Sequence, residues 1–171
     1  MSTATMHRSD DALAMVRAED HYDTSPDDLW QACTDPERLE RWIAQVDGDV
    51  RLGGLVEITF TSSYTGTFRV DACEAPRHLL LTEQAGELTM QLELWISSEG
   101  DGARLVIEDR GLPLEEVHEH AAGWQVHLDD LTRALAAGAT AHPSGWSSER
   151  PSPDWAREWQ LARGSYAPLE G

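Results

Sequence analysis

The sequence contains no lysine and little positive charge of any kind. All 13 basic residues are Arg, against 31 Asp and Glu, so the formal net charge is −18. A surface this acidic repels phosphate backbones and anionic lipid headgroups. We therefore expect neither a nucleic acid nor a membrane as a partner.

Cysteines and long apolar runs are also scarce. The two cysteines, Cys33 and Cys73, form no C-x-x-C motif and have no His at metal-ligand spacing, so we expect two reduced thiols. No stretch approaches the roughly 20 apolar residues that span a bilayer. The N-terminal residues lack the basic segment and apolar run of a signal peptide. These features predict a cytoplasmic protein.

The clearest pattern in the chain is a long amphipathic helix from Pro113 to Gly138. Pro suits a first helical position, and Gly suits the residue just after a helix. Apolar residues recur at alternating spacings of four and three, which places them on one helical stripe. This stripe comprises Val117, Ala121, Trp124, Leu128, Leu131 and Leu135.

The residues before this helix predict one antiparallel sheet. A first strand is expected over 14–24, followed by two short helices whose capping residues are Ser25 and the Thr34–Asp35 pair. Alternating apolar residues and turn signals then predict about six strands, over 50–52, 56–60, 68–72, 78–82, 88–96 and 104–109. A turn is expected at Tyr64-Thr65-Gly66. Such a meander with one apolar face has to curl around the long helix. The fold class is therefore α+β.

Composition divides the chain into three parts. Residues 1–13 are predicted to be a disordered tail, 14–138 the folded domain, and 139–171 an extension with a short helix after Ser152. The extension contains Trp146, Trp155 and Trp159, which need cover from water. Trp95 is predicted to lie on the outer face of the sheet. It either packs under this extension or forms a dimer contact.

Several short motifs occur in a characteristic order. They are Ser25-Pro26-Asp27-Asp28-Leu29-Trp30, Thr34-Asp35-Pro36-Glu37-Arg38-Leu39 with Trp42, Gly48-Asp49, Gly53-Gly54, Glu74-Ala75-Pro76-Arg77-His78-Leu79, and Gly123-Trp124 with His127-Leu128-Asp129 and Leu131. On these motifs, residues 14–138 resemble the family named after the activator of the heat-shock-protein-ninety ATPase. That family lies within the START-like, birch-pollen-allergen-like (SRPBCC) superfamily.

The resemblance implies a helix-grip fold, in which a curved antiparallel sheet wraps around a long C-terminal helix. It also implies a cavity between the helix and the sheet that can hold an apolar ligand. It implies no particular reaction, because the superfamily includes lipid carriers, hormone receptors, cyclases and chaperone regulators, and fold alone does not give function.

Apolar residues on the sheet face and the helix stripe are the candidate walls of this cavity. The alternative for each one is ordinary core packing. The candidates are Trp42, Ile58, Phe60, Phe68, Met90, Leu92, Leu94, Val117, Ala121 and Trp124. His120, His127 and Tyr64 are expected to form a polar rim that could transfer protons.

No metal or cofactor is predicted. Zinc ligands on one helix usually lie one turn apart, whereas His118, His120 and His127 do not. The sequence also lacks a G-x-S-x-G nucleophile elbow, a phosphate-binding glycine loop and a dinucleotide fingerprint. The absence of these signatures weakens an enzymatic interpretation without removing it.

Three functions follow for comparison. The first, which we favour, is binding of a small hydrophobic molecule without catalysis. The second is a cyclase-type or hydrolase-type enzyme that uses the same pocket, with His120, His127 or Tyr64 moving protons. The third is a protein-interaction module that resembles a chaperone ATPase activator or acts as a homodimer.

Overall fold

The computed structural model describes residues 2–170. Eight antiparallel strands form one sheet in the order β1-β2-β8-β7-β6-β5-β4-β3. The strands are β1 Thr3–Arg8, β2 Leu13–Tyr22, β3 Ala44–Asp47, β4 Leu55–Phe60, β5 Thr65–Glu74, β6 His78–Ala85, β7 Leu88–Glu99 and β8 Gly102–Pro113. The helices are α1 Pro26–Thr34, α2 Pro36–Leu39, α3 Val117–Ala137 and α4 Pro153–Ala162, with a 3-10 turn at Arg163–Ser165.

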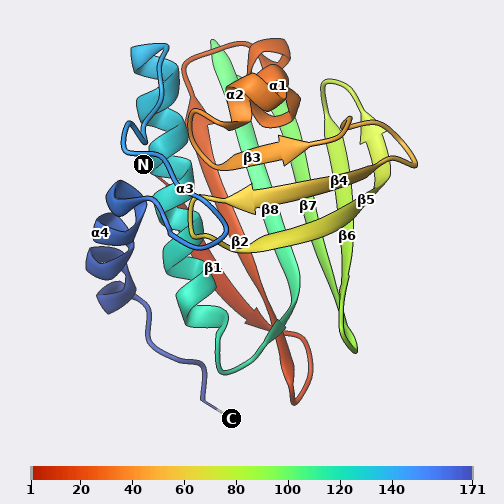
Figure 1. The fold of residues 1–171 in the computed structure, drawn as a ribbon, viewed down its shortest axis with the longest axis vertical. Coiled ribbons are helices and arrows are strands. Elements are labelled where there is room, and N and C mark those ends of the chain that lie inside the picture. The colour runs from red at the N-terminus through yellow and green to blue at the C-terminus, as the bar shows by residue number, and fades with distance from the viewer. Residues whose placement is uncertain (1, 171) are drawn as a thin grey trace.

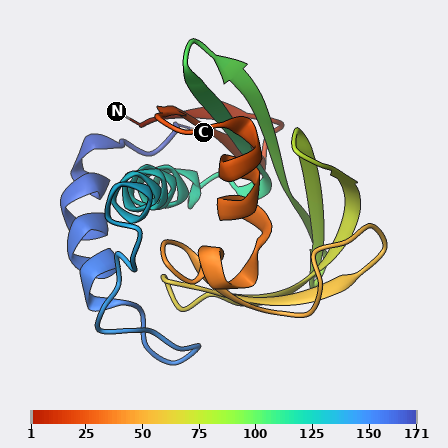
Figure 2. The same cartoon turned by 90° about the horizontal axis from the view of Figure 1, so that it is seen from above.

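The sheet curves around α3, as the helix-grip prediction requires (Figure 1). Seen from above, α3 lies inside the arc of strands, and α4 lies on the side of α3 away from the sheet (Figure 2). The predicted stripe of α3 faces the core, where Val117, Leu128 and Leu131 are fully buried. The α+β class and the antiparallel meander are thus confirmed.

The two short helices after β2 begin where the sequence predicts. The Ser25 hydroxyl accepts a hydrogen bond from the Asp28 backbone N–H, and the Asp35 carboxylate accepts one from Glu37. Both caps precede a Pro, whose missing N–H costs nothing at a first helical position. Among residues 2–170, no helix is both long and apolar enough to cross a bilayer.

Four local predictions are wrong. Residues 3–8 are not disordered: they form β1, because Ala4 and Met6 alternate toward the core and give the strand a half-buried face. The short strand expected over 50–52 is a loop, and the edge strand β3 lies earlier, at Ala44–Asp47. Tyr64 does not turn the chain with Thr65 and Gly66, since β5 already begins at Thr65.

The fourth error concerns the start of the long helix. Pro113 ends β8, and α3 begins at Val117. Gly111 causes the difference: it has φ 82° and sits at a bulge opposite Ala14 and Met15, so that β8 bends and continues through Leu112. A Cβ atom on Gly111 would collide with the Thr89 carbonyl oxygen, so only glycine fits there.

The C-terminal extension packs against α3 and not against the outer face of the sheet. Trp155 and Ala162 of α4 form a small core with Ala122 and Val126 of α3. The expectation that Trp95 lies under the extension is therefore wrong: Trp95 stacks on His78, with 5.8 Å between ring centroids. A dimer contact through Trp95 stays a prediction.

A buried polar cluster ties the extension to the domain. His142 Nδ1 lies 2.7 Å from the hydroxyl of Ser152, and its Nε2 lies 2.9 Å from Asp130 Oδ2 on α3. Ser152 and the His142 side chain are fully buried, so this Ser-His-Asp arrangement is closed to a substrate. Ser152 also caps α4 by accepting from the Trp155 N–H. The cluster is therefore a structural joint.

Replacement of Ser152 by Ala should destabilise the protein. The change removes the α4 cap and leaves a nitrogen of the buried His142 without its partner, which together cost about 1–3 kcal/mol. Urea unfolding followed by far-UV circular dichroism measures the loss. Ser148→Ala, at an exposed position of the same segment, is the matched control. Equal unfolding midpoints for the two variants would refute the structural role of Ser152.

Candidate functional site

Two neighbouring cavities lie inside the curve of the sheet. The outer one lies against α3, and the inner one lies between the short helices with β3 and β4 on one side and β6, β7 and β8 on the other. The inner chamber has a volume of about 60 Å³, and the outer cavity has about 350 Å³. Phe60, Leu92 and Trp124 line both, so they form the boundary between the two spaces. We treat the two cavities as one candidate site.

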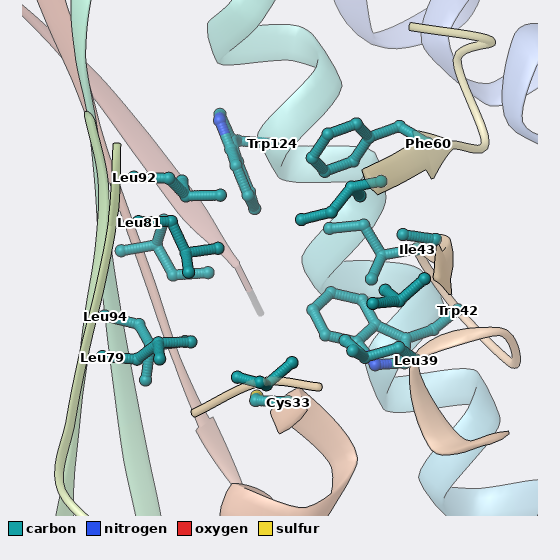
Figure 3. Close-up of a pocket in the computed structure, with 15 residues that line it drawn as sticks. Cys33, Leu39, Trp42, Ile43, Phe60, Leu79, Leu81, Leu92, Leu94 and Trp124 are labelled. Atoms are coloured by element: carbon teal, nitrogen blue, oxygen red, sulfur yellow. The ribbon is translucent and has the colours of Figure 1, made fainter. Parts of the chain in front are cut away.

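The walls of the inner chamber are almost wholly apolar. Leu79, Leu81, Leu92 and Leu94 point into it from the sheet, and Figure 3 shows Trp124 at one end. The other lining residues are Cys33, Leu39, Trp42, Ile43, Ala44, Val46, Val50, Ile58, Phe60 and Ile107. Burial raises the pKa of the Cys33 thiol to about 12, so this group stays neutral and adds no reactive thiolate.

The outer cavity combines aromatic walls with a few polar groups. The Phe60 ring lies 6.2 Å from Phe68 and 6.3 Å from Tyr64, between centroids. Trp124 lies edge-on to His127, at 5.3 Å. The remaining residues that line the outer cavity are Ser62, Glu83, Ala85, Leu88, Met90, Gln91, Leu92, Asp109, Leu112, Pro113, Glu116, His120 and Gly123.

One polar pair stands on the wall formed by β5 and β6. The Tyr64 hydroxyl donates a 2.8 Å hydrogen bond to Glu83 Oε2. Glu83 is buried, and this burial raises its pKa; the nearby charge of Asp109 raises it further, against the lowering effect of the Tyr64 bond. Burial and the hydrogen bond to Glu83 also raise the pKa of Tyr64. Tyr64 therefore stays protonated and acts as a donor.

A second polar group joins β8 to α3. Asp109 Oδ2 accepts a 2.8 Å hydrogen bond from Trp124 Nε1 and lies 3.4 Å from His120 Nδ1. Burial works against the charged form of His120, but the hydrogen bond and the charge of Asp109 outweigh it, and the pKa of His120 is raised. Asp109 thus fixes the orientation of Trp124 and favours a positive His120.

His127 behaves differently from His120. It is buried between Trp124 and Trp155, and burial, together with the charges of His142 and His120, lowers its pKa to about 3. It is therefore a neutral imidazole at physiological pH. Its buried Nδ1 has no hydrogen-bond partner among residues 2–170.

The cavities contain most of the sequence-predicted residues. Trp42, Ile58 and Leu94 line the inner chamber; Phe68, Met90 and the expected rim residues Tyr64, His120 and His127 line the outer cavity; Phe60, Leu92 and Trp124 line both. Val117 and Ala121 line neither, because both are fully buried in the core. In the described part of the chain, no group of three or more His, Cys, Asp and Glu residues is placed to hold a metal ion.

Sequence reasoning missed the two carboxylates. Glu83 follows Leu79 and Leu81 at every second position of β6, and Asp109 follows Leu105 and Ile107 in the same way on β8. Side chains two apart on a strand share a face, so both acids point toward the core. Strand phase was a usable signal for placing both acids in the site.

The family model for "Activator of Hsp90 ATPase homolog 1-like protein" matches residues 23–136, from just before α1 to the end of α3. The chain belongs to this family. The match spans the strands and the helix that enclose the candidate site, and it stops before the extension.

Solved structures agree with this assignment. The solution structure of CalU16 from Micromonospora echinospora is 26% identical, with a TM-score of 0.75 over 98% of this chain and 93% of that chain. Its crystal structure gives 25% identity and a TM-score of 0.71 over 97% of this chain and 96% of that chain. These coverages show that the likeness to CalU16 includes the C-terminal extension.

More distant structures share the fold alone. DynU16, described as a protein of the dynemicin biosynthetic locus, is 24% identical, with a TM-score of 0.68 over 73% of this chain and 48% of that chain. The Aha1 dimer from Colwellia psychrerythraea is 14% identical, with a TM-score of 0.65 over 72% of this chain and 97% of that chain. A comparison with curated proteins finds no match.

Replacement of Asp109 by Asn should lower the pKa of His120. The variant keeps an acceptor for Trp124 but removes the charge of Asp109, which leaves only the charges of Glu116 and Glu119 to oppose the effect of burial. NMR titration of the His120 ring resonances measures the shift. Asp101→Asn, in the exposed β7–β8 turn, is the control. An unchanged His120 titration in the Asp109 variant would contradict the assigned pairing.

Proposed function

We propose that this protein binds a small, largely apolar molecule between α3 and the sheet. The observation that carries the proposal is the outer cavity of about 350 Å³, which shares the walls Phe60, Leu92 and Trp124 with a neighbouring apolar chamber. Small-molecule sites have volumes of about 300–1,000 Å³ and apolar walls with a few converging polar groups. The outer cavity has this size and this composition.

The arrangement of the walls supports a bound molecule with two different ends. An aromatic or aliphatic body would fit the inner chamber and the space between Phe60 and Trp124. A polar end would then face Tyr64, Glu83 and His120 in the outer cavity. Met90 adds an adaptable wall, because its unbranched thioether side chain adjusts to ligands of different shape.

A second candidate function is enzymatic proton transfer on the same ligand. The observation in its favour is the presence of two acid–base pairs in one cavity: the hydrogen-bonded Tyr64 and Glu83, and the ion pair of His120 with Asp109. If this function holds, His120→Gln will spare binding of the extracted ligand and abolish its conversion, followed by mass spectrometry. If turnover persists, His120 has no part in catalysis.

The first experiment is native mass spectrometry of freshly purified protein, followed by organic extraction. A stoichiometric added mass that extracts as one small molecule supports the binding function and begins to identify the ligand. The same spectrum tests self-association, the state named for the Colwellia structure. An empty protein that also fails to bind uncharged apolar probes argues against the proposal.

A bulky side chain at the mouth of the outer cavity should block binding. Ala85, at the end of β6, lines the cavity and is partly exposed, so Ala85→Trp can fill the entrance without disturbing the core. We expect at least a tenfold weaker affinity for N-phenyl-1-naphthylamine, an uncharged fluorescent probe. Gln84→Trp, on the exposed opposite face, should leave the affinity unchanged. Equal affinities in the two variants, at equal melting temperature, would place binding elsewhere.

A further inference from the structure

We propose that the molecule held in the outer cavity carries a protonated amine, and that Glu83 is the counter-ion of that amine. This inference rests on the proposed binding function and specifies the ligand class. Its ligand is a cation with an apolar body, such as an arylalkylamine or a long-chain alkylamine.

Glu83 is a buried carboxylate that lacks a cation. Its exposed fraction is 6%, and its hydrogen-bond partner is the neutral Tyr64 hydroxyl. Among residues 2–170, no Arg or His side chain lies within the 4.0 Å that defines an ion pair with it. Burial of an unpaired carboxylate is costly, so such a group in a cavity wall favours a cationic ligand.

Three other buried or partly buried acids of the fold show how such groups are paired. Glu93, on β7, is paired with both His78 and Arg110, and Asp130, on α3, is paired with Arg133 and His142. Asp109, beside Glu83 in the cavity, has Trp124 and His120. Among the residues that the structure describes, Glu83 differs from these three acids in having no basic side chain beside it.

The charge balance of the outer cavity disfavours an anion. Glu83 on β6, Asp109 on β8 and Glu116 before α3 line it, against a single ionisable base with a raised pKa, His120. Within the described chain, no Arg lines this space. A ligand carboxylate or phosphate would meet three acids, whereas an ammonium group would reduce their mutual repulsion.

The aromatic walls suit a cation as well. Phe60, Tyr64, Phe68 and Trp124 surround the cavity, and the negative faces of aromatic rings attract ammonium groups within about 6 Å. His127 adds no opposing charge, because its pKa of about 3 keeps it neutral.

The test compares three probes that share one aromatic body: 1-naphthylmethylamine, 1-naphthylmethanol and 1-naphthoic acid. Isothermal titration calorimetry at pH 7 measures each affinity for the full chain. We expect the amine to bind at least tenfold more tightly than the alcohol, and the acid to bind most weakly. In Glu83→Gln, the amine should lose this advantage, while the alcohol affinity changes less than about twofold.

Glu57→Gln is the matched control, since Glu57 is exposed on β4 and lines neither cavity. If the alcohol binds and Ala85→Trp blocks it, but the amine binds no more tightly, the amine inference is wrong and the proposed function stands. If no member of the series and no uncharged dye binds, the proposed function fails with it.

A pH series on the unmodified protein keeps the test independent of the folding of Glu83→Gln. The amine's advantage should fall as pH falls through the raised pKa of Glu83, because protonation removes the counter-ion. His120 also gains positive charge as pH falls, whereas Tyr64 stays neutral. The series is therefore repeated in His120→Gln, where a persisting loss belongs to the acids. An advantage independent of pH in both proteins would overturn the role of Glu83.

Discussion

The packing of α3 into the concave face of the sheet is the interaction on which the rest of the structure depends. The sheet exposes one apolar face, and a single helix has to cover it. Val117, Leu128 and Leu131 of α3 are fully buried, but space remains on both sides of the Trp124 ring. The unfilled volume becomes the two cavities, so the site is a direct result of the way the core closes.

Polar groups enter this closed space at few places, and each has a structural cost. Trp124 reaches across from α3 to Asp109 on β8, which fixes the helix relative to the sheet with a buried hydrogen bond. Glu83 on β6 and Tyr64, just before β5, form a second hydrogen-bonded pair nearby. Burying two neighbouring acids among apolar side chains lowers the stability of the fold. Natural sequences usually retain such an arrangement where it serves a function.

Much of the fold follows from local pattern in the sequence. The capped starts at Ser25 and Asp35, the alternation through β7 and the stripe on α3 are all short-range signals, and each gave the right element. Errors occurred where a long-range partner decides the structure. β1 is a strand because it pairs with β2 and packs against α3. The bulge at Gly111 appears only in the pairing of β8 with β2, and it lets β8 continue beyond the turn that the glycine suggested.

The same distinction applies to the site. The apolar walls could be predicted from the inward phase of the strands. Glu83 and Asp109 share that phase but were missed. No pattern in the sequence predicted where the extension packs. It depends on His142 and Ser152 finding Asp130 and Trp42, roughly a hundred residues apart in the case of His142 and Trp42.

The stacking of Trp155 on His127 has a consequence for where the domain ends. His127 has the outer cavity on one side and Trp155 of α4 on the other, at 5.8 Å between ring centroids. At this point the partition between the interior and the extension is one aromatic ring thick. The extension thus forms the outer layer of the cavity wall at His127. The family match ends at residue 136, so it leaves out this layer of the wall.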